Sequence, residues 1–81
     1  MTSKQYQLMS VIIKGNEDGS FVDMDELLER IAYKTTKQSV QFSLRALINR
    51  NMINKQEREK RRGRRRAVFS ATRMGYHMMK G

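Results

Sequence analysis

The 81-residue sequence contains no cysteine, no proline, no tryptophan and a single histidine. Without cysteine the chain has no disulfide scaffold and no nucleophilic thiol, and one histidine provides none of the usual zinc-site spacings. We therefore expect no metal site and no cofactor. The sequence also lacks a paired nucleophile and base and a glycine loop that could cradle a phosphate, so we do not expect an enzyme.

Long hydrophobic runs are missing as well. The unbroken apolar runs, such as Val11 to Ile13 and Ala67 to Phe69, do not exceed three residues, whereas a membrane span needs about 20. We expect no membrane partner and a cytoplasmic location, with nucleoid association if the source is bacterial or phage. The length predicts one domain over positions 1–81. A domain of this size buries only roughly 60–65% of its unfolded surface, so neither a deep cavity nor a small-molecule substrate is expected.

Positive charge is in excess, with 17 basic against 8 acidic residues and a net charge of +9. This balance indicates a polyanionic partner. Much of the charge lies between Lys55 and Arg66. Taken alone, the run KRRGRRR would fit a disordered basic run or a localisation signal as well as it fits an ordered element. Apolar residues flank this segment on both sides, which favours a hairpin with a cationic tip.

Local signals divide the first third of the chain into two elements. Thr2 followed by Gln5 has the form of a capping box, which predicts a helix from Ser3 to Lys14. Turn-forming residues follow, and positions 21–22 predict a very short strand.

A second capping box, Asp23 with Glu26, opens a helix that we expect to end near Tyr33. The apolar face of this helix consists of Met24, Leu27, Leu28 and Ile31. Its acidic residues either form ion pairs, within the chain or with a basic partner, or favour the helix N-terminus electrostatically.

A third capping box, Thr35 with Gln38, predicts a helix from Thr36 to Arg50. This helix is expected to stop at Asn51, because asparagine tolerates the left-handed conformation after a helix. Its apolar face consists of Val40, Leu44, Leu47 and Ile48.

The last third of the chain predicts two strands and a helix. One strand begins at Ile53, and a return strand runs from about Arg65 to Ala71, with Phe69 as its core anchor. Thr72 caps a last short helix, which Gly75 is expected to weaken.

Two helices joined by a turn of about Tyr33 to Thr35 and followed by a basic hairpin form a helix-turn-helix with a wing. The sequence therefore predicts the α+β class, with three helices, a β-hairpin wing and a short C-terminal helix.

Three stretches of the sequence are TTKQSVQFSLRALINRNMI, RRGRRRAVFSAT and TRMGYHMM. Through them the chain resembles the winged helix-turn-helix family, in particular the MarR-like and PadR-like bacterial regulators. The three stretches are similar to the family's recognition helix with its first wing strand, its arginine-rich wing with the return strand, and the threonine-x-x-glycine start of the next helix. Positions 35–79 are covered, whereas positions 2–34 match in element order alone. Asn51 stands where the family usually has glycine. The resemblance implies the DNA-binding unit of these regulators rather than their dimer interface or ligand pocket.

The helix from Thr36 to Arg50 has a second face, which lies opposite its apolar one at about 100° per residue. Its candidate DNA contacts are Gln38, Gln41, Phe42, Arg45 and Asn49. Glutamine and asparagine pair with adenine, arginine pairs with guanine, and an aromatic ring can touch a thymine methyl group. Each of these is equally compatible with an ordinary solvated position. For Phe42, packing against the wing or the first helix is the alternative to base contact.

The wing and the start of the same helix supply candidate backbone contacts. The wing candidates are Arg58, Lys60, Arg61, Arg62, Arg64, Arg65 and Arg66. Arginines at such a tip suit a narrow minor groove or the phosphates beside it, although non-specific electrostatics is the simpler alternative. Thr35, Thr36 and Lys37 can fix a phosphate at the helix start, although capping alone also explains the threonines.

The function predicted first is a sequence-specific protein for double-stranded DNA, acting as a transcriptional repressor or accessory factor. A second hypothesis is a winged helix that binds structured RNA, which a competition between duplex DNA and RNA would separate. A third is a basic module for an acidic protein surface, which would form no stable nucleic-acid complex at about 0.15 M salt. The sequence leaves open whether a homodimer forms.

Overall fold

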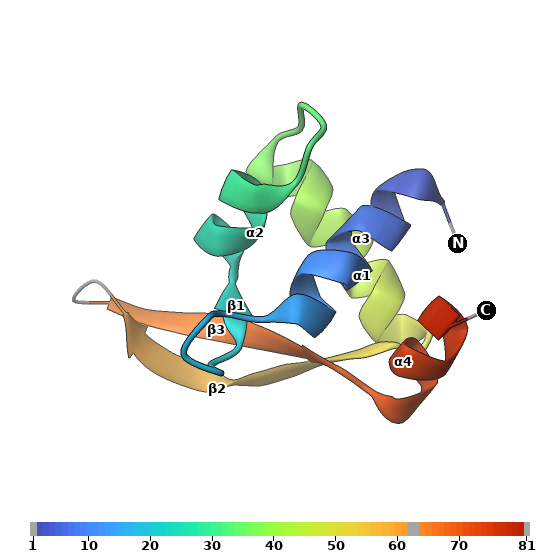
Figure 1. Ribbon diagram of the computed structural model, residues 1–81. Helices are drawn as coiled ribbons and strands as arrows, with labels where there is room; N and C mark the ends of the chain where they lie inside the picture. Colours follow the sequence, from blue (N-terminus) through green and yellow to red (C-terminus); the bar gives the residue numbers. More distant parts are fainter. Residues whose placement is uncertain (1, 62–63, 81) are drawn as a thin grey trace.

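A computed structural model of the protein describes residues 2–61 and 64–80, and for residues 57–61 and 64–65 the backbone alone. The elements in chain order are α1 (Ser3–Lys14), β1 (Val22–Asp23), α2 (Met24–Arg30), α3 (Lys37–Asn49), β2 (Ile53–Arg61), β3 (Arg64–Ala71) and α4 (Arg73–Lys80). The three strands form an antiparallel sheet in the order β1-β3-β2. Figure 1 shows that the β2–β3 hairpin extends beyond the helices on one side, with α4 at the opposite end of the sheet. The α+β prediction is confirmed.

The first helix has the predicted bounds, because Thr2 and Gln5 form the expected reciprocal capping box. The short strand is shifted by one residue, to Val22–Asp23, and Phe21 is 44% exposed. Asp23 pairs with Val68 of β3, which draws this residue into the sheet before its side chain caps α2.

The second helix begins as predicted but ends at Arg30, so the expected end near Tyr33 and the short turn of Tyr33 to Thr35 were wrong. The backbone of Ile31 is extended, with φ −74° and ψ 145°, and its side chain packs against the core. The side chain of Arg30 turns back to the α1–β1 loop. Tertiary contacts of Arg30 and Ile31 therefore end this helix earlier than the helix propensity of the sequence predicts.

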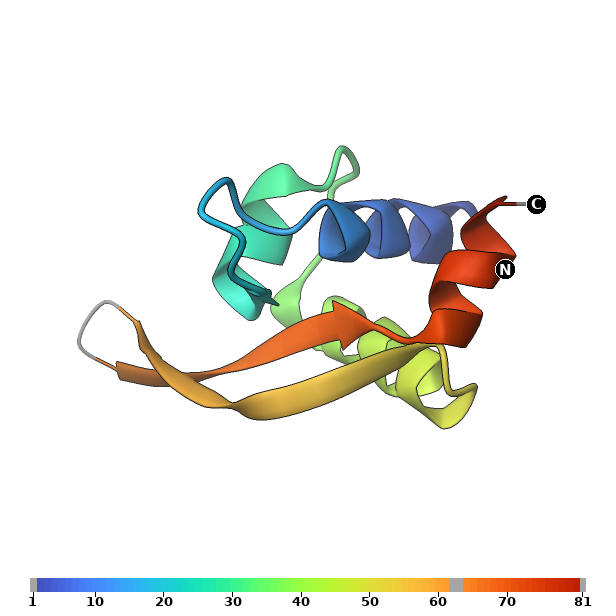
Figure 2. The ribbon, with the colours of Figure 1, turned by 60° about the horizontal axis from the view of Figure 1, so that its bottom comes forward.

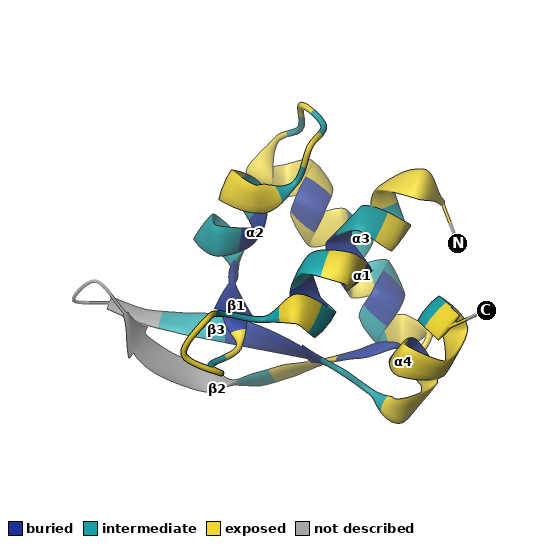
Figure 3. Cartoon of the chain, in the orientation of Figure 1, coloured by how far each residue is buried: buried dark blue, intermediate teal, exposed yellow. Residues whose placement is uncertain are grey.

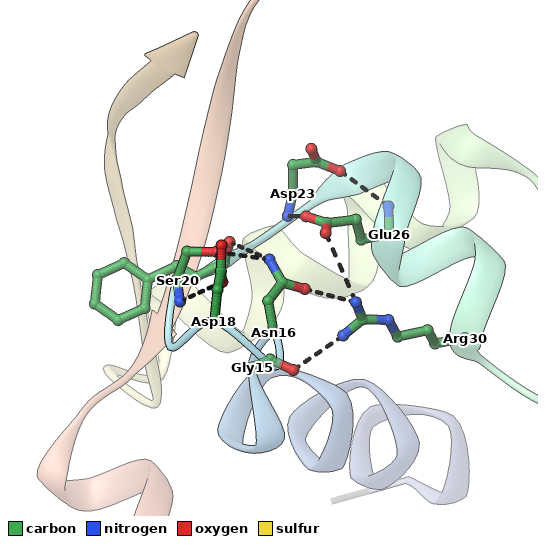
Figure 4. A network of polar contacts seen from close by, with 8 residues as sticks. Gly15, Asn16, Asp18, Ser20, Asp23, Glu26 and Arg30 are labelled. Carbon is green, nitrogen blue, oxygen red and sulfur yellow. Dashed lines mark hydrogen bonds and ion pairs between the residues drawn. The ribbon is translucent and has the colours of Figure 1, made fainter. Parts of the chain in front are cut away.

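Arg30 joins α2 to the loop that follows α1 (Figure 4). Its guanidinium donates to the carbonyl oxygen of Gly15 at 3.0 Å and to Oδ1 of Asn16 at 2.6 Å. Asn16 in turn donates through Nδ2 to Oγ of Ser20 and to the carbonyl oxygen of Phe21. This network sets the position of α2 relative to α1 and β1.

The third helix is capped by Thr36, not by the predicted Thr35 with Gln38. The backbone N–H of Ser39 donates to Oγ1 of Thr36 at 3.1 Å. The backbone of Thr36 is extended, with φ −105° and ψ 158°, which is typical of an N-cap residue.

The end of α3 follows the predicted stop at Asn51, whose φ is 63°. The N–H of Met52 donates to the carbonyl oxygen of Leu47, and the N–H of Asn51 donates to that of Ile48. This pair of bonds is a Schellman ending, and asparagine adopts here the conformation that glycine usually supplies.

The core lies between the helices and the sheet (Figure 3). Its buried residues are Leu8, Met9, Ile12, Val22, Leu27, Val40, Leu44, Leu47, Met52, Ile53 and Phe69. Phe69 is 5% exposed, so its prediction as a core anchor is confirmed.

Gly75 permits close packing of α4 and does not interrupt the helix. A Cβ at this position would collide with the carbonyl oxygen of Met52 and with the end of the Met9 side chain. Thr72 caps the helix as predicted, because its Oγ1 accepts from the N–H of Gly75 at 3.0 Å.

Candidate nucleic-acid interface

The candidate face of α3 points outward. Gln38, Gln41, Phe42, Arg45 and Asn49 are all exposed, whereas Val40, Leu44 and Leu47 are buried. Phe42 is 75% exposed, which does not fit the alternative that its ring packs against the wing or the first helix. A large apolar side chain is thus held in solvent among groups that can read base edges.

The three residues predicted to fix a phosphate, Thr35, Thr36 and Lys37, lie at the start of α3. Thr36 and Lys37 are exposed and Thr35 is half-buried. Because Oγ1 of Thr36 accepts from Ser39, capping accounts for this hydroxyl. Lys37 is the first residue of α3, so its positive charge lies at the N-terminus of this helix.

The backbone of the wing is paired almost to its tip. Glu59 pairs with Arg66, Lys60 with Arg65, and Arg61 with Arg64, after an irregularity between Gln56 and Glu59. Figure 2 shows the two strands running out beyond the helices. Arg62 lies outside the described residues, and so do the side chains of Arg58, Lys60, Arg61, Arg64 and Arg65.

Arg66 has a partner within the protein. Its Nη1 lies 2.7 Å from Oδ2 of Asp25 in the first turn of α2, and the two side chains are 24% and 30% exposed. The Nε atom of Arg66 is buried and has no acceptor among the described residues. The pair ties the base of the wing to α2 and confirms that an acidic residue of this helix pairs within the chain.

A groove lies between α3 and the base of the wing, with a volume of about 430 Å³. The residues that line it are Met24, Lys37, Gln41, Leu44, Arg45, Ile48, Lys55, Arg66, Ala67 and Phe69. Lys55 is exposed and was not among the sequence candidates. The signal that could have found it is its pairing with Phe69 across the hairpin, which puts both side chains on the face that α3 covers.

Residues 2–61 and 64–80 contain neither a membrane-spanning helix nor a cluster of metal ligands. No described helix is both long and apolar enough to span a bilayer. In the same residues, no group of three or more histidine, cysteine, aspartate or glutamate side chains is arranged to hold a metal ion.

No family model matches the sequence, and no curated protein matches it significantly. Solved structures, however, match the chain in fold. The chain superposes on a MepR A103V mutant from Staphylococcus aureus with a TM-score of 0.80, at 14% identity, over 99% of this chain and 53% of that one. A PadR family transcription regulator from Clostridium difficile gives a TM-score of 0.78 at 15% identity, over 98% of this chain and 81% of that one.

A third structure is Bacillus subtilis PadR in complex with operator DNA, with a TM-score of 0.73 and 8% identity. It is matched over 99% of this chain and 46% of its own length, so the chain spans about half the length of this PadR and of MepR. The element order, the wing and these superpositions confirm the architecture predicted from the sequence. The chain has the winged helix-turn-helix fold, in which α2 and α3 are the helix-turn-helix and β2–β3 is the wing.

Proposed function

We propose that this protein binds double-stranded DNA in a sequence-dependent manner as a transcription regulator. The observation that carries the proposal is the outer face of α3, where Gln38, Arg45 and Asn49 surround a phenylalanine that is 75% exposed. The structure of PadR with operator DNA supports the proposal, because that protein shares this fold.

In the proposed complex α3 lies in the major groove. Arg45 pairs with a guanine, Gln38 and Asn49 pair with adenines, and Phe42 contacts thymine methyl groups. Gln41 lies toward the groove beside the wing, where it can reach the sugar–phosphate backbone. These contacts determine which sequence is bound.

The wing and the base of the groove supply contacts that do not depend on sequence. Arg58, Lys60, Arg61, Arg62, Arg64 and Arg65 lie along or next to a strand pair that extends beyond the helices, and we assign them to the minor groove and its phosphates. Lys37 and Lys55 add charge at the base of the wing. With about five phosphate contacts, log K falls against log salt with a slope of roughly 4–5.

The test is a selection of bound fragments from a random double-stranded DNA library at about 0.15 M salt, a concentration at which non-specific contacts are weakened. A recovered motif supports the proposal, and an inverted repeat within it indicates a homodimer. Recovery of structured RNA in a parallel competition would support the RNA alternative. Absence of any nucleic-acid complex would leave the acidic protein surface as the partner and overturn the proposal.

A further inference from the structure

Four exposed side chains form one line along the outer face of α3. They follow each other at intervals of four, three and four residues, which is the spacing of one helix face, and are Gln38, Phe42, Arg45 and Asn49. In the described part of the chain, none of the three polar ones is engaged in a hydrogen bond or an ion pair with another residue. The helix contains Lys37 and Arg45 and no acidic residue. These side chains are therefore available to a polyanionic partner.

Phe42 is the apolar member of this line, and it is 75% exposed. On the base edges of the major groove, the apolar group is the C5 methyl of thymine, whereas the other groups are hydrogen-bond donors and acceptors. A ring held outward between base-reading side chains therefore matches a methyl group at C5 of a pyrimidine. The same methyl group is present at the same atom in 5-methylcytosine, whereas uracil and cytosine lack it. The feature that matches Phe42 is thus the methyl group, and not one particular base.

The neighbours of Phe42 on the helix determine what is read beside the methyl group. Thymine presents an acceptor at C4, whereas 5-methylcytosine, like cytosine, presents a donor there. Gln38 lies one turn before Phe42, and its side-chain amide carries both a donor and an acceptor, so it can pair with either base. Arg45 lies one turn after Phe42, at about 4.5 Å along the helix axis, which is close to the roughly 3.4 Å between successive bases. Arg45 can therefore pair with a guanine next to the methylated pyrimidine.

We infer that the protein discriminates DNA by methylation at C5 of a pyrimidine, and that it binds 5-methylcytosine beside a guanine as it binds thymine beside a guanine. This inference rests on the proposed function and names the modified base that the same helix face accepts. Affinity is higher for thymine than for uracil, and higher for 5-methylcytosine than for cytosine. Each ratio is about fourfold, which is the fold-change for burial of one methyl-sized apolar group. A cytosine beside a guanine thereby becomes a binding position when it is methylated.

The test uses the whole chain and two pairs of random duplex libraries. One pair contains thymidine or deoxyuridine throughout, and the other contains deoxycytidine or 5-methyldeoxycytidine throughout. We expect the methylated member of each pair to be retained better at about 0.15 M salt. Duplexes recovered from the methylated libraries are then titrated with the methyl group present or absent at a single position, where the expected ratio of dissociation constants is about four. Discrimination of thymine from uracil without discrimination of 5-methylcytosine from cytosine would overturn the inference for the modified base.

Variants assign the methyl contact to one side chain. Phe42→Ala is expected to reduce both ratios to about one, and Phe42→Leu, which keeps an apolar side chain, to leave ratios of about two. Tyr6→Ala removes an aromatic side chain that is 52% exposed on α1. It is the matched control and is expected to keep both ratios of the wild type. Ratios retained by Phe42→Ala would overturn the contact, because an effect of the methyl group on DNA shape acts without this ring.

Two kinds of failure are distinguishable in this experiment. Circular dichroism first establishes that each variant is folded. If the wild-type chain binds no duplex from any library, the proposed function fails and the inference fails with it. If it binds all four libraries, and the recovered duplexes, with ratios of about one, the inference is overturned while the proposed function stands.

Discussion

Phe69 at the base of the hairpin and Phe42 on α3 differ sharply in how far they are exposed to solvent. Phe69 of β3 is 5% exposed and belongs to the core, whereas Phe42 of α3 is 75% exposed and has polar and cationic neighbours on its helix. Both side chains have the same chemistry, so their burial alone separates the stabilising role of Phe69 from the binding role that we propose for Phe42. We therefore expect that the fold and the proposed binding surface can be altered independently.

The largest expected effect is on stability. Phe69→Ala should lower the free energy of unfolding by about 3–5 kcal/mol, because it removes a buried ring and leaves a cavity. Phe42→Ala, the matched control, should change it by less than about 0.5 kcal/mol. Urea denaturation followed by circular dichroism measures both. Similar losses for the two variants would show that Phe42 is packed in solution.

The next effect is on DNA affinity. Replacing Arg61, Arg62, Arg64 and Arg65 together by alanine should lower affinity for every sequence and reduce the salt slope by about 0.9 for each lost phosphate contact. Arg45→Ala should instead cost about 1–3 kcal/mol at one or two base positions. Binding titrations on selected and random duplexes at several salt concentrations distinguish these results. The division of roles is wrong if both variants act equally on random DNA.

Gly75→Ala should lower the free energy of unfolding by about 1–3 kcal/mol, because the added methyl group forces α4 away from the carbonyl oxygen of Met52. Met78→Ala, at an exposed position of the same helix, provides the control and should change stability by less than about 0.5 kcal/mol. Thermal unfolding measures both variants. A stabilising effect of Gly75→Ala would mean that helix propensity outweighs the close approach.

The smallest effect concerns the ion pair at the wing base. A double-mutant cycle of Asp25→Ala and Arg66→Ala should give a coupling energy of about 0.2–1 kcal/mol, because both side chains are partly exposed. The DNA affinity of Asp25→Ala measures whether the pair also positions the wing. A coupling energy of zero would show that α2 does not restrain β3 through this contact.

The parts of the fold that could be predicted from the sequence depend on short-range interactions. The reciprocal bonds of Thr2 and Gln5 fix the start of α1, and the left-handed tolerance of Asn51 fixes the end of α3. The end of α2 could not be predicted in this way, because Arg30 binds a loop 14 and 15 residues away in sequence. The cap of α3 was predicted at Thr35 because Gln38 completes the capping-box pattern, whereas the structure uses Thr36, which accepts from the N–H of Ser39.

The candidate site shows the same division. The outer face of α3 follows from helical periodicity, and its residues are exposed as predicted. Lys55 was missed because its position in the groove depends on the register of the hairpin and on the packing of α3. Arg66 was grouped with the tip arginines because the run of charge is continuous, although its pairing with Asp25 is set by the distant helix α2.

Thr72 connects the end of α3 to the start of α4. Thr72 donates its backbone N–H to the carbonyl oxygen of Met52 at 3.0 Å and its hydroxyl to that of Asn51 at 2.7 Å. These carbonyls belong to the two residues that form the Schellman ending of α3, and Thr72 also caps α4. These hydrogen bonds hold the N-terminus of α4 against the C-terminal end of α3. A displacement of α4 is therefore expected to change the orientation of α3, the helix that we propose lies in the major groove of DNA.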